Sequence, residues 1–205
     1  MKHPLWSYAG PACGILYVVL SVVGLVIHGY PSGNGAQIKH WIATANATRF
    51  GVGIWIEALG YLLFVPFAAW LARELRRPGH AEWPADVAFG AAILTTGSAL
   101  LINGLWTGVF DAGRNGADQT VLAAAYYLTS DAYAASVPFS GLFLVAAGAA
   151  AVIARSLPPW LAWAGVAIGV LAIIPATALP ASPALWLWVV AVCGRAAITL
   201  RTRRT

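Results

Sequence analysis

The sequence has 205 residues, of which 60% are hydrophobic and only 9% are charged, with a net charge of +5 and a mean hydropathy of +0.75. Soluble domains carry about 25% charged residues, so this composition excludes a soluble globular protein and indicates an integral membrane protein. A chain of this length is expected to form one domain over residues 1–205.

Apolar stretches that can cross a bilayer as helices, at about 20 residues each, recur along the chain. They are predicted at residues 9–28, 51–71, 87–110, 135–154, 160–178 and 184–200. Between the first two, Ile38, Trp41, Ile42 and Ala45 recur at helical spacing, which predicts a short amphipathic helix at the membrane interface. The predicted fold class is therefore all-α, an integral membrane bundle of about six transmembrane helices.

The third predicted span contains a regular series of glycines. Gly90, Gly97 and Gly104 recur every seven residues, and small residues at such spacing let a neighbouring helix approach closely. Asp111 continues the same step, so we expect it to start from the packed face of this helix rather than from the lipid face.

Residues 120–154 form a stretch that is too long for one straight span, because a helix rises 1.5 Å per residue. Pro138 is predicted to divide it into an outer amphipathic portion, residues 121–134, and the fourth span. Turns are predicted at Pro78-Gly79, at Leu157-Pro158-Pro159 and between Pro180 and Pro183.

The basic residues favour one topology, with both the N-terminus and the C-terminus in the cytoplasm. Six spans would then leave only Lys39, Arg49 and Arg114 outside. The basic tail RTRRT could bind anionic headgroups, whereas no motif accompanies it that would indicate nucleic-acid binding. The residues predicted to be cytoplasmic are Lys2, Arg73, Arg76, Arg77, Arg155, Arg195, Arg201, Arg203 and Arg204.

Glu57 is the only charged residue in the second predicted span. An ionisable group at such depth is costly to bury and usually marks a functional site. It lies roughly 9 Å from the outer end of its span by helical rise. Asp111 closes the third span on the same side and Asp131 opens the fourth, so three carboxylates are predicted to converge in the outer half of the bundle.

The neighbours of these acids predict a shared cavity. Gly53 and Gly60 flank Glu57 on one helical stripe and leave space beside the acid. His28 ends the first span at the same level and could pair with a carboxylate, although its spacing is not diagnostic. The residues predicted to bind a substrate there are Tyr61, Asn103, Trp106, Thr107 and Tyr127.

Each acid also has a purely structural interpretation. Glu57 could hydrogen-bond Asn103 or a tyrosine and simply lock helices together. Asp131 could cap a helix, and Asp111 could pair with Arg114. These alternatives remain open at the level of the sequence.

The sequence indicates no cofactor and no metal centre. It contains no nucleotide-binding, zinc-protease or serine-nucleophile motif, and its four histidines are scattered. Cys13 and Cys193 lie in apolar runs and are expected to be buried free thiols.

The segments GILYVVLSVVG, LARELRR and LPPWLAWAGVAIGVL, with the amphipathic segment between the first two spans, resemble a broad group of small polytopic actinobacterial membrane proteins of unknown function. That resemblance covers most of the chain and implies a helical bundle but no activity. Trp55-Ile56-Glu57 is also similar in placement to the acidic second span of membrane-embedded terpene cyclases. This second resemblance implies that Glu57 protonates an epoxide or alkene, although those cyclases have seven spans and a second acid in the last.

These observations favour a multi-pass enzyme of the cell membrane that acts on a lipophilic, isoprenoid-like molecule by acid catalysis, as a cyclase or isomerase. A carboxyl group in a low-dielectric environment keeps its proton more readily than in water, which suits a general acid. Glu57 would donate the proton, and Asp111 or Asp131 would tune it or accept the final proton. The alternatives are a proton-coupled transporter or efflux protein, possible as an oligomer, and a structural or accessory membrane protein.

Overall fold

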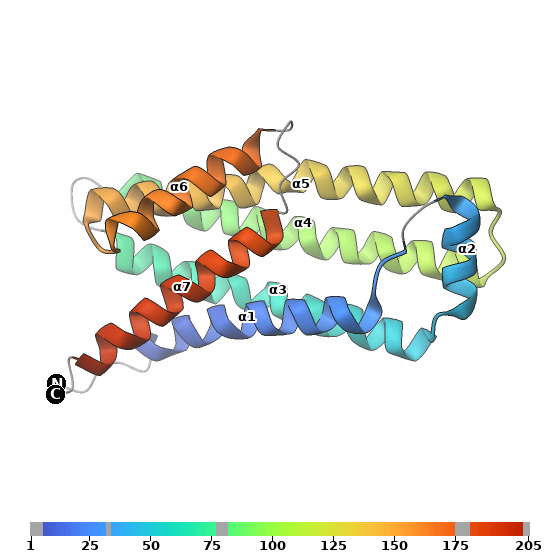
Figure 1. The fold of residues 1–205 in the computed structure, drawn as a ribbon, viewed down its shortest axis with the longest axis horizontal. Coiled ribbons are helices and arrows are strands. Elements are labelled where there is room, and N and C mark those ends of the chain that lie inside the picture. Colours follow the sequence, from blue (N-terminus) through green and yellow to red (C-terminus); the bar gives the residue numbers. More distant parts are fainter. Residues whose placement is uncertain (1–5, 32–33, 77–81, 175–180, 203–205) are drawn as a thin grey trace. The chain divides into compact units, whose positions relative to one another are not determined.

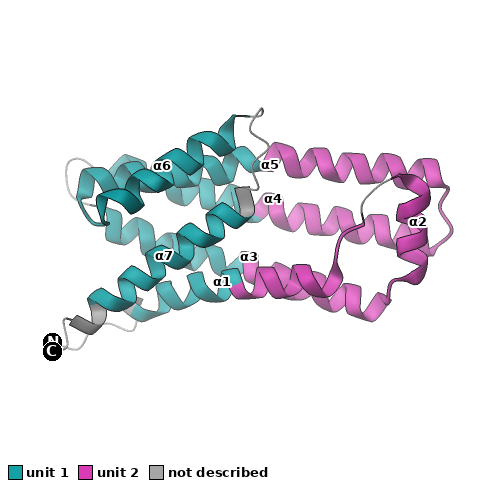
Figure 2. Ribbon diagram, in the orientation of Figure 1, with its two compact units in different colours: residues 1–18, 62–96, 137–205 teal, residues 19–61, 97–136 magenta. Residues whose placement is uncertain are grey.

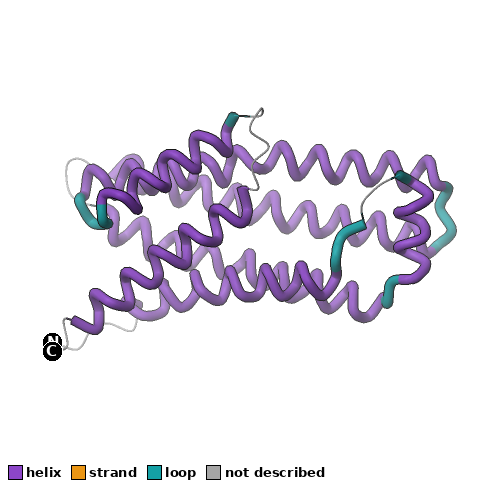
Figure 3. The backbone as a smooth tube through the Cα atoms, in the orientation of Figure 1, coloured by secondary structure: helices purple, strands orange, loops and turns teal. Residues whose placement is uncertain are grey.

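The computed structural model describes residues 6–31, 34–76, 82–174 and 181–202. In these ranges the chain consists of helices joined by short turns and loops and contains no strand (Figures 1 and 3), so the all-α prediction is confirmed. The helices are α1 (Trp6–His28), α2 (Gly35–Thr44), α3 (Ala47–Leu75), α4 (Glu82–Arg114), α5 (Gln119–Ala154), α6 (Pro159–Ile173) and α7 (Ala181–Thr202).

Four of these helices, α1, α3, α4 and α5, are long and apolar enough to cross a membrane, while α6 and the apolar part of α7 are shorter. The full count of six spans stays a prediction. The short helix expected between the first two spans is α2, and its N-terminus carries a capping box in which Asn34 and Gln37 bond each other's backbone nitrogens, at 3.1 and 2.8 Å.

The turns join these helices in part as expected. Pro158 and Pro159 start α6, as the sequence predicts, because proline suits the first turn of a helix. The turn predicted at Pro78-Gly79 lies outside the described residues, and so does Pro180. Pro183, predicted to end the last turn, lies instead in the first turn of α7, where a helix tolerates proline.

Pro138 does not divide its stretch, and this prediction is wrong. It lies inside one continuous helix, α5, of 36 residues. A proline removes one backbone hydrogen bond but fixes φ at a value that a helix accepts, and apolar membrane helices tolerate it. Pro11 in α1 and Pro66 in α3 lie inside helices in the same way.

The chain forms two compact units (Figure 2). Each of the helices α1, α3, α4 and α5 has one part in unit 1 and the other part in unit 2. Unit 1 comprises residues 1–18, 62–96 and 137–205, and unit 2 comprises residues 19–61 and 97–136. Because Glu57 lies in unit 2, the structure of that unit decides the surroundings of the predicted acidic site.

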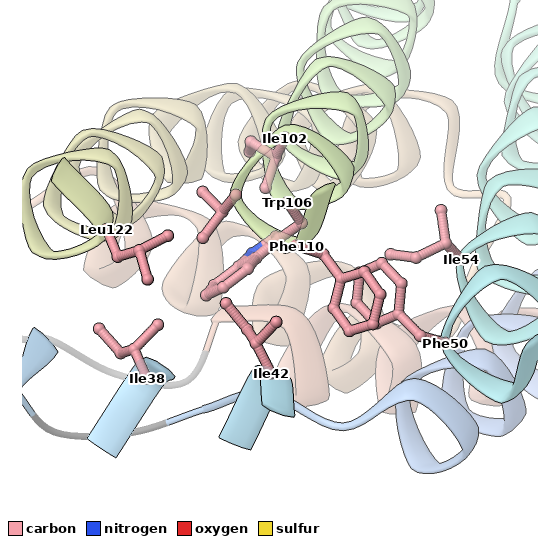
Figure 4. Close-up of a cluster of buried hydrophobic side chains, with 9 residues drawn as sticks. Ile38, Ile42, Phe50, Ile54, Ile102, Trp106, Phe110 and Leu122 are labelled. Carbon is pink, nitrogen blue, oxygen red and sulfur yellow. The ribbon is translucent and has the colours of Figure 1, made fainter. Parts of the chain in front are cut away.

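The core of unit 2 gathers the amphipathic helix α2 and the adjoining parts of α3, α4 and α5 (Figure 4). Phe50 of α3 stacks on Phe110 of α4 with ring centroids 4.0 Å apart, and Ile42 of α2 packs over Gly113. The fully or nearly fully buried members of this cluster are Ile38, Ile42, Phe50, Ile54, Ile102, Trp106, Val109, Phe110 and Leu122.

Unit 1 has its own core, built around aromatic rings. Phe64 lies 4.9 Å from Phe143 between ring centroids, and the indole of Trp188 donates a hydrogen bond of 3.0 Å to the backbone oxygen of Leu161. Cys13 and Cys193 are free thiols, Cys193 buried and Cys13 half-buried. The expected free thiols are therefore confirmed, and the expected burial is confirmed for Cys193 alone.

The glycine series of α4 lies on the opposite face from the one predicted. Gly90, Gly97 and Gly104 are exposed, and a methyl group added at any of them would meet nothing within 4 Å. Asp111, which continues the series, is exposed as well. The prediction that these residues mark the packed face is wrong, because in unit 2 the large apolar residues of α4, such as Trp106 and Phe110, occupy that face instead.

Candidate functional site

The centre of the candidate site is a buried pair formed by His28, the last residue of α1, and Glu57 of α3. The imidazole Nε2 of His28 lies 3.0 Å from the carboxyl Oε2 of Glu57. The two side chains are 0% and 3% exposed. Buried ionisable groups must be paired or neutralised, and here each group is the partner of the other.

The two ring nitrogens of His28 have different hydrogen-bond partners. The other ring nitrogen of His28, Nδ1, lies 2.7 Å from the backbone oxygen of Gly29, and a carbonyl oxygen can only accept. Nδ1 therefore carries a hydrogen. One further proton between Nε2 and Oε2 would satisfy their contact, either as a neutral imidazole beside a carboxylic acid or as an imidazolium beside a carboxylate.

Two tyrosines complete the surroundings of the carboxyl group. The hydroxyl of Tyr61, one helical turn along α3, donates a hydrogen bond of 2.8 Å to Oε1 of Glu57. Tyr30 lies on the segment that follows α1 and is 41% exposed. Its pKa is nevertheless raised above the ordinary tyrosine value, first by desolvation of the hydroxyl and then by the charge of Glu57.

Glycines bring α1 and α3 close enough for this pair to form. A methyl group at Gly24 would lie 2.6 Å from Cβ of Glu57 and 2.7 Å from its backbone nitrogen, and one at Gly53 would lie 2.7 Å from Cβ of His28. A methyl group at Gly60 would lie 2.9 Å from the backbone nitrogen of Ser21. The stripe of small residues around Glu57 is thus a helix–helix seam rather than the wall of a cavity.

Asp111 and Asp131, the other two predicted acids, do not join the pair. Both are exposed, and among the described residues neither has a side-chain hydrogen bond or an ion pair with Glu57. The predicted convergence of three carboxylates is therefore wrong. Asp131 lies within α5 and does not cap a helix, and Asp111 forms no ion pair with Arg114 in the described part of the chain.

Comparison with known proteins gives no relative from which a role could be carried over. No family model, curated protein or solved structure matches the chain. The family resemblances of the sequence accordingly stay expectations, and a function has to be argued from the site itself.

The five residues predicted to bind a substrate do not all lie beside Glu57 in the structure. Tyr61 contacts Glu57 directly, and Trp106 is buried with its ring centroid 5.0 Å from that of Tyr30. Thr107 bonds only the backbone oxygen of Asn103, at 2.9 Å, as threonine does inside helices. Asn103 is buried with its amide nitrogen unpartnered among the described residues, and Tyr127 is 59% exposed.

Tyr30 is the member of the site that the sequence did not place in it. The possible pairing of His28 with a carboxylate is confirmed by its contact with Glu57, and the antiparallel order of the first two spans could have singled out His28 as the partner. Tyr30 had no such signal, because it follows α1 outside any regular element. The alternative that Glu57 bonds a tyrosine is confirmed by Tyr61, whereas no bond to Asn103 is found.

A cavity of about 360 Å³ lies beside this pair within unit 2. It is open on one side and is lined by the end of α1, the end of α2 and the start of α3. Its lining includes His28 and Gly29, together with Val26, Ile27, Trp41, Thr44, Ala45, Asn46, Arg49 and Phe50.

Proposed function

We propose that this chain is an integral protein of the cell membrane with six transmembrane helices and both termini in the cytoplasm. The proposal is supported by the four helices that are long and apolar enough to span a bilayer and by the positive-inside distribution of lysine and arginine. The helices α6 and α7 would supply the remaining spans. His28 and Glu57 would then lie in the outer half of the bundle.

We infer that its function is proton-coupled movement of a small molecule across the membrane, with the His28–Glu57 pair as the group that binds and releases the proton. The observation that carries this inference is the contact of 3.0 Å between Nε2 of His28 and Oε2 of Glu57, two buried groups that one shared proton would join. Removing that proton leaves a lone pair of His28 facing a carboxylate, and adding another leaves two donors facing each other. Either change favours opening of the contact.

Opening of this contact would couple the proton to the helices. His28 belongs to α1 and Glu57 to α3, and within unit 2 these segments meet along the seam of Gly24, Gly53 and Gly60. A proton that leaves the pair would therefore loosen a helix–helix contact. A change in protonation that biases a helix arrangement is what proton-coupled transport needs.

The proposal can be tested in proteoliposomes that contain the pH-sensitive dye pyranine. Gradients of decanesulfonate or decyltrimethylammonium serve as driving ions, because neither carries a titratable proton near neutral pH. We expect one of them to drive proton movement with the native protein and not with Glu57→Gln. Glu74→Gln, which changes an exposed carboxyl on the same helix, is the matched control. Equal proton movement with Glu57→Gln would refute the relay.

Acid catalysis on a lipophilic, isoprenoid-like substrate is the second candidate, and a row of aromatic rings favours it. The ring of His28 lies 4.7 Å from Tyr30, and Trp106 follows at 5.0 Å from Tyr30 and 5.6 Å from Tyr126. Aromatic faces stabilise a developing cation. Against direct proton donation, both carboxyl oxygens of Glu57 already have partners, so a substrate has to displace one.

The catalytic candidate makes its own prediction. Protonation of an epoxide oxygen opens its C–O bond, an alkene closes the ring on the resulting cation, and loss of a C–H proton returns that proton to the site. The product is an isomer of the substrate. An epoxidised farnesyl derivative incubated with the native protein should then give a product of unchanged mass and altered chromatographic retention, and Glu57→Gln should give none.

A further inference from the structure

The cavity beside His28 is lined by both apolar and polar groups, with one arginine among them. Its apolar lining comes from three segments, and Trp41 of α2 meets Phe50 of α3 edge to face at 6.0 Å between ring centroids. Ligand sites are typically concave and mostly apolar, with a few polar groups that fix orientation, and range from about 300 to 1,000 Å³. At about 360 Å³ this cavity accommodates a small ligand or one end of a larger one.

Arg49 supplies the charge, and its guanidinium is held at the cavity. Its Nε donates a hydrogen bond of 2.9 Å to the backbone oxygen of Ile27, which is another lining residue. Its two Nη groups have no partner among the described residues. An arginine oriented through Nε keeps these remaining donors for a carboxylate, sulfonate or phosphate group.

The other charged and polar groups of the lining are also compatible with an anion. The lining contains no aspartate or glutamate. Asn46 caps the start of α3, since its side-chain oxygen accepts a hydrogen bond of 2.9 Å from the backbone nitrogen of Arg49. The positive end of the α3 dipole therefore lies at the same place as the guanidinium, and both favour negative charge.

We propose that this cavity binds an amphiphilic anion, with the anionic group on the Nη donors of Arg49 and the apolar body against Val26, Trp41 and Phe50. The anionic group could belong to a free amphiphile or to a membrane lipid. The proposal names the ligand class for the cavity next to the proton pair, but it rests on Arg49 and the cavity walls rather than on Glu57. Binding can therefore succeed or fail independently of proton movement.

The test measures binding of three probes with the same ten-carbon chain to the full chain in micelles of an uncharged maltoside. Decanesulfonate is the anion, decanol the neutral molecule and decyltrimethylammonium the cation. We expect decanesulfonate to bind at least about tenfold more tightly than the other two, because a hydrogen bond to a charged group is worth more than one factor of ten in affinity. Equal binding of decanol would overturn the proposal.

Variants separate the cavity from general electrostatic attraction. Arg49→Gln should lose the preference for decanesulfonate, whereas Arg114→Gln, which removes an exposed arginine outside the cavity, should keep it. Ala45→Phe, which places a ring in the cavity, should weaken all three probes. Equal losses in Arg49→Gln and Arg114→Gln would overturn the proposal. Circular dichroism of each variant confirms that the helices are intact.

A second arm identifies the source of the anion. In nanodiscs, phosphatidylglycerol supplies an anionic headgroup and phosphatidylcholine a neutral one. If phosphatidylglycerol competes with decanesulfonate and phosphatidylcholine does not, the cavity takes a lipid headgroup. If neither lipid competes, it takes a free amphiphile. Glu57→Gln should retain decanesulfonate binding in both cases, because the anion site does not include that carboxyl.

Discussion

Replacement of Glu57 by glutamine or leucine tests whether the buried pair is held as the structure describes. Glutamine matches the network when His28 is neutral. Its amide N–H can donate to Nε2 of His28, and its carbonyl oxygen can accept from Tyr61. Leucine has a similar volume but offers neither group, so His28 and Tyr61 both lose their partner.

The contacts give the magnitude. With Leu at position 57, Nε2 of a side chain that is 0% exposed is left without a partner, and such an orphaned group costs about 1–3 kcal/mol. The hydroxyl of Tyr61 loses a further bond within α3, and such a bond contributes about 0.5–1.5 kcal/mol net. We therefore expect Glu57→Leu to lower the free energy of unfolding by roughly 2 kcal/mol and Glu57→Gln by less than about 1 kcal/mol.

Unfolding by dodecyl sulfate in mixed maltoside micelles, followed by circular dichroism, measures both variants against Glu74→Gln. The result that contradicts the described hydrogen bonds is a glutamine variant that is as unstable as the leucine variant. A stable glutamine variant that no longer moves protons also separates a proton function from a purely structural role of Glu57. Full proton movement in that variant, with normal stability, points to the accessory role instead.

Three further predictions concern the seam, the exposed tyrosine and the remaining acids. Gly24→Ala should destabilise the protein by about 1–3 kcal/mol because its methyl group meets backbone, while Gly104→Ala, in open space, should stabilise it by about 0.5–1 kcal/mol; thermal unfolding shows whether the signs are opposite. Because the folded protein raises the pKa of Tyr30, stability should be complete below about pH 10 and fall above it, and Tyr30→Phe should reduce that loss in unfolding measured across alkaline pH. Asp111→Asn and Asp131→Asn should each change the stability by no more than about 0.5 kcal/mol and leave proton movement in pyranine-loaded vesicles unaltered.

The helical class and the buried acid could be read from the sequence, because both depend on local composition. A long apolar run has to satisfy its backbone hydrogen bonds internally and so becomes a helix, whatever its neighbours are. A single glutamate in such a run must find a polar partner. The capping box at Asn34 is local in the same sense, since Gln37 lies only one turn away.

The sequence of the second span alone does not show which residue contacts the carboxyl group of Glu57. The stripe of Gly53 and Gly60 indicated a close approach of something small, but not whether a substrate or another helix fills the space. The structure brings Gly24 of α1 against this stripe. That contact places His28, four residues further on, beside the carboxyl group.

The tertiary structure also decided which face of α4 is buried. Glycines seven residues apart lie on one face of a helix, but this spacing does not show whether that face is packed or exposed. In unit 2 the buried face of α4 is the one that carries Trp106 and Phe110, because these large apolar side chains fill the space against α2 and α3. Asp111 is left on the exposed face and cannot join Glu57.

The sequence by itself thus determined that the chain forms long apolar helices and that one of them carries a buried carboxyl group. Only the tertiary structure decided that this group contacts His28 rather than two other acids. The reason is that hydropathy and helical period are properties of each segment alone. The choice of partner depends on how the side chains of two helices fit together.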